Sequence, residues 1–276
     1  MINADLPIIR SFWFGKPMNW ICDLSMKSYI CQGHKFELYC YEEFSVPEGV
    51  IRMDANEIIP ESASFQMMNS VDGIRGRYST FANIFRYKLL FEKGGVWSDL
   101  DSICIKPLIF DDSIEVMFAT ENSKSGIEIN NCNIYVAKSG NPLFEKLYTS
   151  SISQEVKSLE HLSFNKNFII EKMEEIGIDW TSFTSPREMF CPIPWFRIHQ
   201  IFNPKHEFEL MEMMEKTYAI HLYNNIIEAD YPDYLKFTRI ETSFISQLES
   251  FVNSINQSKF HTVSSGLKQT TDILSP

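Results

Sequence analysis

The sequence lacks several features that would place it in a specialised class of protein. A helix that crosses a membrane needs about 18 consecutive apolar residues, and no stretch of this chain approaches that length. The formal net charge of −11 at pH 7 argues against a nucleic-acid partner, because phosphates require a basic face. It also disfavours adhesion to anionic lipid through charge alone. We therefore expect neither a membrane span nor a nucleic-acid partner.

Cysteine pairs of the Cys-x-x-Cys type are also absent. The six cysteines are Cys22, Cys31, Cys40, Cys104, Cys132 and Cys191. Three of them sit in or beside apolar runs, where a reduced thiol behaves as a small hydrophobe. We expect structural thiols, with a metal site or a nucleophile as the alternatives and no disulfide framework.

The N-terminal residues MINADLPIIRSFWFG have neither the basic start nor the small-residue cleavage site of a signal peptide. Cytoplasmic residence is therefore the expectation, including residence at the inner face of the cell membrane.

The 276 residues are ample for one large α/β domain and marginal for two. Residues 7–14 and 36–41 are apolar and β-prone, and the segment between them, 19–32, has helical periodicity. Two strands with a helix between them predict a right-handed βαβ unit and a Rossmann-like sheet. Further predicted elements are a strand over 115–122, a strand, turn and helix over 126–148, a helix over 154–177 and a strand over 217–225.

Two segments are expected to be irregular. Residues 61–78 have no clear period and are predicted to be a loop, and so are the Pro- and aromatic-rich residues 185–196. Residues 51–60 carry no assigned chemistry. We expect one domain over residues 1–239, an amphipathic helix over 240–256 and a disordered tail over 257–276.

One apolar stripe dominates the predicted C-terminal helix, and no basic residue flanks the stripe within that segment. The helix is expected to pack on the body of the protein. A contact with a protein partner or with the periphery of a membrane is the alternative.

Residues 81–108, FANIFRYKLLFEKGGVWSDLDSICIKPL, contain the most informative pattern. A helix is predicted first, with Ser79 or Thr80 as its N-cap, and Gly94-Gly95 is predicted to end it. The short apolar run that follows should be a strand that delivers Asp99 and Asp101 to one face of the sheet.

Paired carboxylates repel each other unless a cation lies between them, and oxygen ligands of this kind suit Mg²⁺ or Mn²⁺. An Asp-x-Asp pair is also common in surface turns, so the pair alone does not settle the matter. The context of Asp99 and Asp101 adds weight: Arg86, a helix, Gly-Gly and an aromatic strand residue precede them in that order.

This arrangement resembles the core motif of the DXD-containing sugar transferases of capsule and lipopolysaccharide synthesis, and more distantly the glucosylating bacterial toxins. The resemblance extends along most of residues 7–225, and only a few short segments within it are specific to these families. It implies a GT-A fold, which is a Rossmann-like mixed sheet flanked by helices. It also implies a nucleotide-sugar donor, a saccharide or lipid-linked glycan acceptor, and a divalent metal on the donor pyrophosphate.

The resemblance assigns roles to the first strand and to the helix. Trp13-Phe14-Gly15 resembles a turn whose Trp stacks on the uracil of the donor, and Lys16 stands where the family has a second Gly. Packing of Trp13 in the core is the alternative. Asn83 and Arg86 lie three residues apart, so both are expected to reach the donor sugar.

Further site residues follow from the same resemblance. Asn130 and Asn131 are candidates beside the transferred sugar, with an Asx-turn as the alternative. His221 would be the third protein ligand of the metal, although a single His beside an apolar strand is often structural. Asn224 or Asn225 would hold donor phosphate.

The resemblance also assigns different roles to the two aspartates. Asp101 would bind the metal directly, and Asp99 would act through the ribose or through a metal-bound water.

The resemblance therefore implies a metal-dependent, UDP-sugar glycosyltransferase, and the likeness to α-glycosyltransferases implies that configuration is retained. Two other functions remain as alternatives. Phosphatases of the haloacid dehalogenase type also carry Asp-x-Asp, but they place it after the first strand of the sheet. The other alternative is a transferase-like domain that binds nucleotide sugars without turnover.

Overall fold

The computed structural model describes residues 6–66, 78–123, 126–130, 133–154, 164–235 and 242–262. Its centre is a six-stranded sheet with the strand order β3-β2-β1-β4-β9-β6. The strands of this sheet are β1 (Ile9–Trp13), β2 (Phe36–Cys40), β3 (Val50–Asp54), β4 (Gly95–Trp97), β6 (Val116–Phe118) and β9 (Tyr135–Ala137). Strands β3, β2, β1 and β4 run parallel, whereas β9 is antiparallel to both β4 and β6. The expected Rossmann-like mixed sheet is confirmed.

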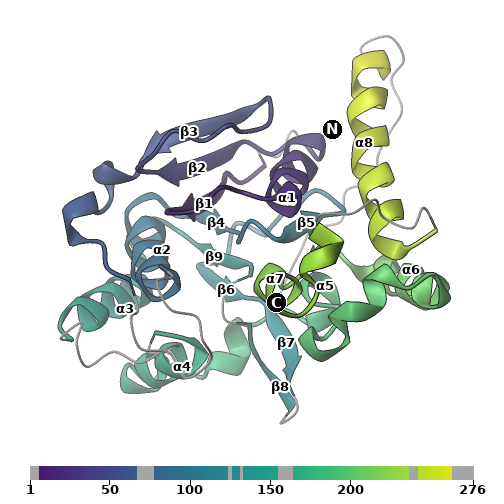
Figure 1. Ribbon diagram of the computed structural model, residues 1–276. Helices are drawn as coiled ribbons and strands as arrows, with labels where there is room; N and C mark the ends of the chain where they lie inside the picture. Colours follow the sequence, from purple (N-terminus) through teal and green to yellow (C-terminus); the bar gives the residue numbers. More distant parts are fainter. Residues whose placement is uncertain are drawn as a thin grey trace.

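Two small antiparallel sheets of two strands each are separate from this sheet. The first pairs β10 (Ala219–His221) with β5 (Ser102–Cys104), and the second pairs β7 (Thr120–Ser123) with β8 (Gly126–Ile129). In Figure 1 the β7–β8 hairpin projects from the lower edge of the molecule. The β10–β5 pair matters more for the site, because it brings a late segment of the chain beside the Asp-x-Asp pair.

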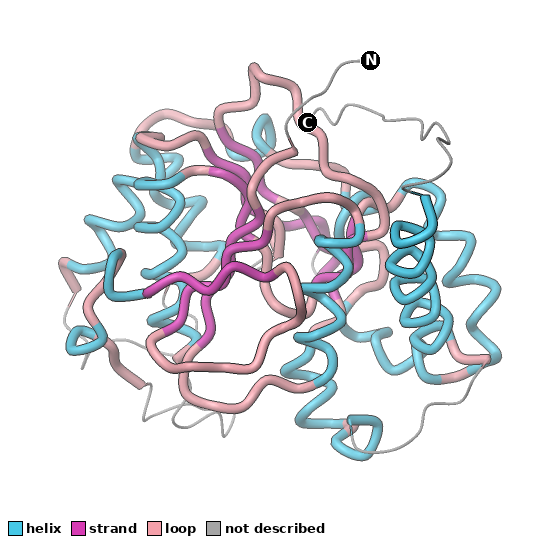
Figure 2. Tube along the Cα trace, turned by 90° about the horizontal axis from the view of Figure 1, so that it is seen from above, coloured by secondary structure: helices cyan, strands magenta, loops and turns pink. Residues whose placement is uncertain are grey.

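Helices cover both faces of the sheet, as the view from above in Figure 2 shows. They are α1 (Trp20–Cys31), α2 (Ser79–Lys93), α3 (Pro142–Ile152), α4 (Lys166–Glu175), α5 (Arg187–Phe190), α6 (Glu207–Met213), α7 (Asn224–Asp230) and α8 (Phe244–Thr262). Helices α2, α3 and α4 share one apolar cluster with the sheet, and α1 packs on the opposite face. The expected α/β fold with flanking helices is therefore the observed one.

Local sequence explains how the helices begin and end. The Asn19 side chain caps α1 by accepting from two backbone N–H groups of its first turn. Helix α2 begins without a side-chain cap: Tyr78 is its N-cap residue, and Ser79 and Thr80 lie inside the helix rather than capping it.

The turn from α2 into β4 requires glycine at two positions. Gly94 and Gly95 both have positive φ angles, of 64° and 86°. A Cβ atom on Gly94 would lie 2.5 Å from the Ser139 nitrogen, and one on Gly95 would lie 2.3 Å from Arg10 Nη1. Both positions therefore exclude a side chain, and the predicted Gly-Gly helix end is confirmed.

Several predicted elements differ from the observed ones in detail. Residues 50–54 form the edge strand β3, which the sequence did not reveal because most of its side chains are exposed and do not alternate. The expected strand over 115–122 splits into β6 and β7, which belong to different sheets. Residues 126–148 likewise hold two strands before α3. Residues 185–196 are not wholly irregular, since they contain α5 and the start of a 3-10 helix.

The C-terminal helix α8 begins at Phe244 and extends to Thr262, so it takes in the start of the expected tail. Its apolar stripe packs on α1 and on neighbouring segments through four buried side chains, Phe244, Ile245, Leu248 and Val252. The expected packing on the body is confirmed. Figure 1 shows α8 at one flank of the molecule. Within the described ranges, no helix combines the length and the apolar character that a membrane crossing requires.

Candidate active site

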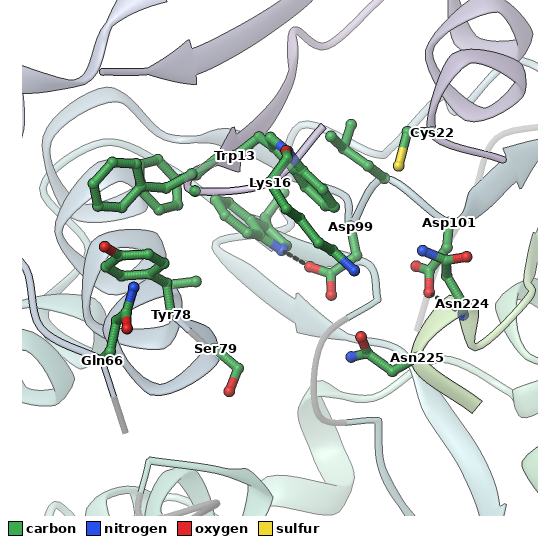
Figure 3. Close-up of a pocket in the computed structure, with 16 residues that line it drawn as sticks. Trp13, Lys16, Cys22, Gln66, Tyr78, Ser79, Asp99, Asp101, Asn224 and Asn225 are labelled. Atoms are coloured by element: carbon green, nitrogen blue, oxygen red, sulfur yellow. Dashed lines mark hydrogen bonds between the residues drawn. The ribbon is translucent and has the colours of Figure 1, made fainter. Parts of the chain in front are cut away.

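A cavity of about 250 Å³ opens at the carboxyl ends of β1 and β4 (Figure 3). Parallel strands present their carboxyl ends at one edge, and ligands of open α/β sheets bind there. The residues that line the cavity come from the β1 loop, the first turns of α1, α2 and α7, the end of β4 and the turn after it. They include Trp13, Phe14, Lys16, Tyr78, Ser79, Asp99, Asp101, Asn224 and Asn225.

Trp13 and Phe14, the predicted base-binding residues, both line this cavity. The Trp13 indole is partly exposed, and its Nε1 donates a hydrogen bond of 2.6 Å to the Lys16 carbonyl oxygen. Phe14 packs against the ring of Tyr78, with 4.1 Å between ring centroids. A flat, partly exposed indole at the rim of the cavity is available for stacking.

Asp99 and Asp101 reach the cavity from a turn rather than from a strand. Strand β4 ends at Trp97, so the predicted alternation along one strand does not apply. The turn nevertheless brings both carboxylates to the same cavity. The expected convergence holds, but its cause is the turn between β4 and β5.

The two carboxylates have different partners. Trp97 Nε1 donates to Asp99 Oδ1 at 2.6 Å, and Arg86 Nη1 lies 3.9 Å from the same oxygen. Burial raises the pKa of Asp99 to about 6, although the Arg86 guanidinium opposes that shift. Asp101 Oδ2 accepts from the backbone nitrogen of Asn224 at 2.8 Å, at the start of α7.

Asp101 Oδ1 faces the imidazole of His221, with 3.3 Å between Oδ1 and Nε2. This oxygen is buried and has no hydrogen bond of good geometry. Burial alone would lower the pKa of His221, but the Asp101 carboxylate outweighs burial, so the pKa lies well above the usual value. The same pairing holds the pKa of Asp101 below its usual range, although burial opposes it.

His221 is placed by the register of β10 on β5, in which it lies opposite Ser102. The other ring nitrogen, Nδ1, lies 3.3 Å from Asn130 Nδ2. The Asn130 oxygen accepts from the backbone nitrogen of Asn133 at 2.8 Å. Asn130 is thus buried behind His221 and helps to orient it. Asn131, predicted beside the transferred sugar, lies outside the described residues.

The spacing of the Asp101 and His221 donor atoms suits a divalent cation, and of the two residues Asp101 is the one that lines the cavity. Two neighbouring ligands of an octahedral ion, each about 2.1 Å from it, lie about 3 Å apart, close to the observed 3.3 Å. The proton shared by this pair must leave first. In the described part of the chain, no group of three or more His, Cys, Asp or Glu side chains is already arranged around one metal position.

Arg86 and Asn83 lie behind the cavity rather than on its lining. Arg86 is buried, its guanidinium lies 4.3 Å from the centroid of the Tyr135 ring, and its Nη2 donates to Asn83 Oδ1 at 2.8 Å. Their predicted contact with the donor sugar stays a prediction. In this geometry Arg86 acts on the site through the carboxylate of Asp99.

Asn224 and Asn225 occupy the first turn of α7 and line the cavity. The Asn224 side chain accepts from Asn19 Nδ2 at 2.9 Å, which ties α7 to the cap of α1. Asn225 is exposed beside it. The backbone N–H of Asn224 already donates to the Asp101 carboxylate, and the phosphate role predicted for Asn224 or Asn225 stays a prediction.

Sequence reasoning did not find the pair formed by Glu121 and Tyr223. Tyr223 is the one non-glycine residue with positive φ in the described ranges, at 51°, and its hydroxyl donates to the buried Glu121 carboxylate at 3.0 Å. The bond fixes the corner between β10 and α7. The available signal was a charged residue, Glu121, in β7, shortly after the apolar run of β6. Cys22 also lines the cavity, and burial raises the pKa of its thiol to about 12, as expected for a structural thiol.

Two family models match the chain. Residues 25–124 match the "glycosyltransferase sugar-binding region containing DXD motif", which includes Asp99 and Asp101. Residues 170–232 match the "alpha 1,4-glycosyltransferase conserved region", which includes His221. Each match spans less than half of the chain. The chain is thus an enzyme of the glycosyltransferase class, and its DXD region is the one that the structure places at the cavity.

Solved structures with similar folds include three transferases. The PaToxG glycosyltransferase is 17% identical, with a TM-score of 0.43, and the match covers 62% of this chain and 71% of that one. A transferase with two cysteine-to-serine substitutions is 14% identical, with a TM-score of 0.42 and coverages of 63% and 87%. The apo form of GlyE from Streptococcus pneumoniae TIGR4 is 12% identical, with a TM-score of 0.43 and coverages of 93% and 64%. No curated protein is significantly similar to the chain.

The phosphatase alternative does not agree with the topology. Enzymes of that type need Asp-x-Asp at the end of the first strand, whereas here the pair follows β4, and Trp13 and Gly15 stand at the end of β1. The family matches point the same way.

Proposed function

We propose that this enzyme transfers a sugar from a UDP-sugar to a saccharide or lipid-linked glycan acceptor in the synthesis of a bacterial surface polysaccharide such as a capsule or lipopolysaccharide. One observation carries the proposal. A partly exposed indole, two carboxylates and the start of α7 line a single cavity at the carboxyl ends of β1 and β4. Base, diphosphate and metal would each find a chemically matched partner there.

The base would stack on Trp13. Its indole is anchored through Nε1 to the Lys16 carbonyl, so one face of the ring is held toward the cavity without a further loss of freedom on binding. The aromatic ring of Phe14 closes the wall beside it.

The diphosphate would lie between Trp13 and the acidic pair. Asp101 and His221 would hold Mn²⁺ or Mg²⁺, with Asp99 acting through the ribose or a metal-bound water. Water and donor oxygens would complete the coordination. The ion, once bound, neutralises the charge that develops on the departing UDP. The backbone N–H groups of α7 would add partial positive charge from the other side.

Retention of configuration is part of the proposal and rests on the resemblance to α-glycosyltransferases. Asn83, Arg86, Asn130 and Asn131 would support the donor sugar or the residues that touch it. Arg86 would stabilise the ionised form of Asp99, from which it lies 3.9 Å.

Calorimetry with UDP and Mn²⁺, followed by metal-dependent hydrolysis of a panel of nucleotide sugars, tests the proposal. We expect UDP to bind more tightly with Mn²⁺ than without it, and one UDP-sugar to be hydrolysed in a chelator-sensitive reaction. Binding without any hydrolysis or transfer would indicate a silent nucleotide-sugar-binding domain. Failure to bind UDP would refute the proposed donor class.

A further inference from the structure

Lys16 occupies a position that the proposed function leaves without a role. Among the described residues that line the cavity, it is the one basic side chain. It follows Gly15 in the loop after β1, and its side chain extends into the cavity toward the acidic pair (Figure 3). Its carbonyl oxygen accepts the Trp13 indole N–H at 2.6 Å, so the base-stacking ring and Lys16 are held together.

The Lys16 ammonium is paired with Glu228 on α7. The Lys16 side chain is 45% exposed and the Glu228 side chain 20% exposed. An exposed ion pair of this kind contributes little to stability, because water solvates both partners when they separate. Lys16 can therefore leave Glu228 at small cost when a stronger anion enters the cavity.

Glu228 also has bonds that keep its carboxylate in place without Lys16. Its Oε1 accepts from Asn19 Nδ2 at 3.1 Å and from Asn224 Nδ2 at 3.3 Å. The carboxylate thus stays bonded to the cap of α1, Asn19, and to the first residue of α7, Asn224, while its other oxygen, Oε2, accepts from the Lys16 ammonium. The lysine is the movable partner of the pair, because its four-carbon side chain is flexible.

The charges in the cavity favour a further cation. Asp99 and Asp101 supply negative charge, and a diphosphate brings more. A divalent ion and the Arg86 guanidinium, 3.9 Å from Asp99, offset only part of this sum. Ionised hydrogen bonds to phosphate are among the strong ones in proteins, so a phosphate oxygen would compete well for the ammonium. The ammonium lies 5.8 Å from the centroid of the Trp13 ring. At that distance it can contact a phosphate attached to a nucleoside whose base stacks on Trp13.

We propose that Lys16 binds the diphosphate of the nucleotide donor, and that Glu228 holds the Lys16 ammonium at the cavity until the diphosphate displaces it. The ligand class is a nucleoside diphosphate, and the inference rests on the proposed function. Glu228 then acts as an internal competitor: it keeps the lysine in place in the free enzyme and weakens the affinity for the phosphates.

The test compares UDP with uridine, which lacks phosphates, in the full chain with Mn²⁺. Lys16→Met should weaken UDP binding about tenfold or more, since one charge-assisted bond is lost, and leave uridine binding within about twofold. Glu228→Gln keeps an oxygen for Asn19 and Asn224 but loses the charge. It should strengthen UDP binding severalfold and leave uridine unchanged. Lys138→Met removes another exposed ion pair, with Glu115, and is the matched control.

The proposal depends on Lys16→Met and Glu228→Gln changing the affinity for UDP in opposite directions. If Lys16 and Glu228 form only a structural tie, both variants would lower the melting temperature together and weaken UDP and uridine alike. That result, or an unchanged ratio of UDP to uridine affinity in Lys16→Met, overturns the inference while leaving the proposed function intact. If the wild-type enzyme does not bind UDP, the proposed function fails and the inference fails with it.

Discussion

His221 Nε2 lies 3.3 Å from Asp101 Oδ1, and this contact joins the end of β10 to the turn that follows β4. The two residues belong to the two regions matched by separate glycosyltransferase models. The antiparallel pairing of β10 with β5 places His221 opposite Ser102, and the Leu222 nitrogen donates to the Asp101 carbonyl at 2.8 Å. Backbone pairing thus sets the distance between the two side chains.

Asp101→Asn should abolish most metal-dependent activity. The variant keeps an oxygen for the Asn224 nitrogen but loses the charge that a cation needs. Hydrolysis of the UDP-sugar should fall by at least about a hundredfold at saturating Mn²⁺. Initial rates measured over a Mn²⁺ titration check this. Asp111→Asn, at an exposed turn, is the control and should retain wild-type rates. Full activity of Asp101→Asn would remove Asp101 from the site.

Asn130→Asp distinguishes a metal-binding His221 from a structural one. A histidine that binds metal through Nε2 donates Nδ1–H to an acceptor, and a carboxylate is the best one. If His221 is a ligand, the variant should tighten Mn²⁺ binding severalfold, as measured by calorimetry. If His221 only pairs with Asp101, the added charge would stabilise the imidazolium, and Mn²⁺ would bind more weakly. The backbone nitrogen of Asn133 keeps its acceptor in either case.

The long regular elements were predictable from the sequence, because their patterns are local. Strand β1 is a continuous apolar run, and the helix, Gly-Gly turn and strand at 79–97 each carry their own signal. Strand β5 was not predicted, because it has three residues and its pairing partner β10 is distant in the chain.

The residues of the candidate site also differ in whether a local sequence pattern predicts their place. Trp13 ends β1, Asp99 and Asp101 follow β4, and all three line the cavity. Arg86 and Asn130 are buried behind it, and their burial depends on tertiary packing that no local pattern reports. The bond between Glu121 and Tyr223 joins β7 to the corner before α7, so no local pattern reports it.

Trp13→Ala should separate stacking from packing. If the indole stacks on the base, UDP affinity should fall by roughly 1–3 kcal/mol, with little change in the melting temperature without ligand. Trp13→Phe keeps a ring but loses the hydrogen bond to the Lys16 carbonyl, so an intermediate UDP affinity is expected. Calorimetry and thermal unfolding are the two measurements. A large loss of stability with unchanged UDP affinity would instead make Trp13 a core residue.

Asn83→Asp tests whether the side chain that accepts a hydrogen bond from the buried Arg86 also acts on the donor sugar. Arg86 Nη2 donates to Asn83 Oδ1 at 2.8 Å, and the same guanidinium lies 3.9 Å from Asp99. A carboxylate at position 83 would bind Arg86 more strongly than the amide does. It would also place a charged acceptor where the amide now offers one oxygen and an NH₂ group.

We expect Asn83→Asp to change the relative turnover of different UDP-sugars while the affinity for UDP itself stays within about twofold, because the effect acts at the sugar and not at the base. Rates with a panel of UDP-sugars, together with the UDP dissociation constant, measure both quantities. Asn167→Asp, on the exposed face of α4, is a matched control for the added charge. An unchanged donor ranking and rate in Asn83→Asp would mean that Asn83 supports Arg86 only, and that the donor sugar lies elsewhere in the cavity.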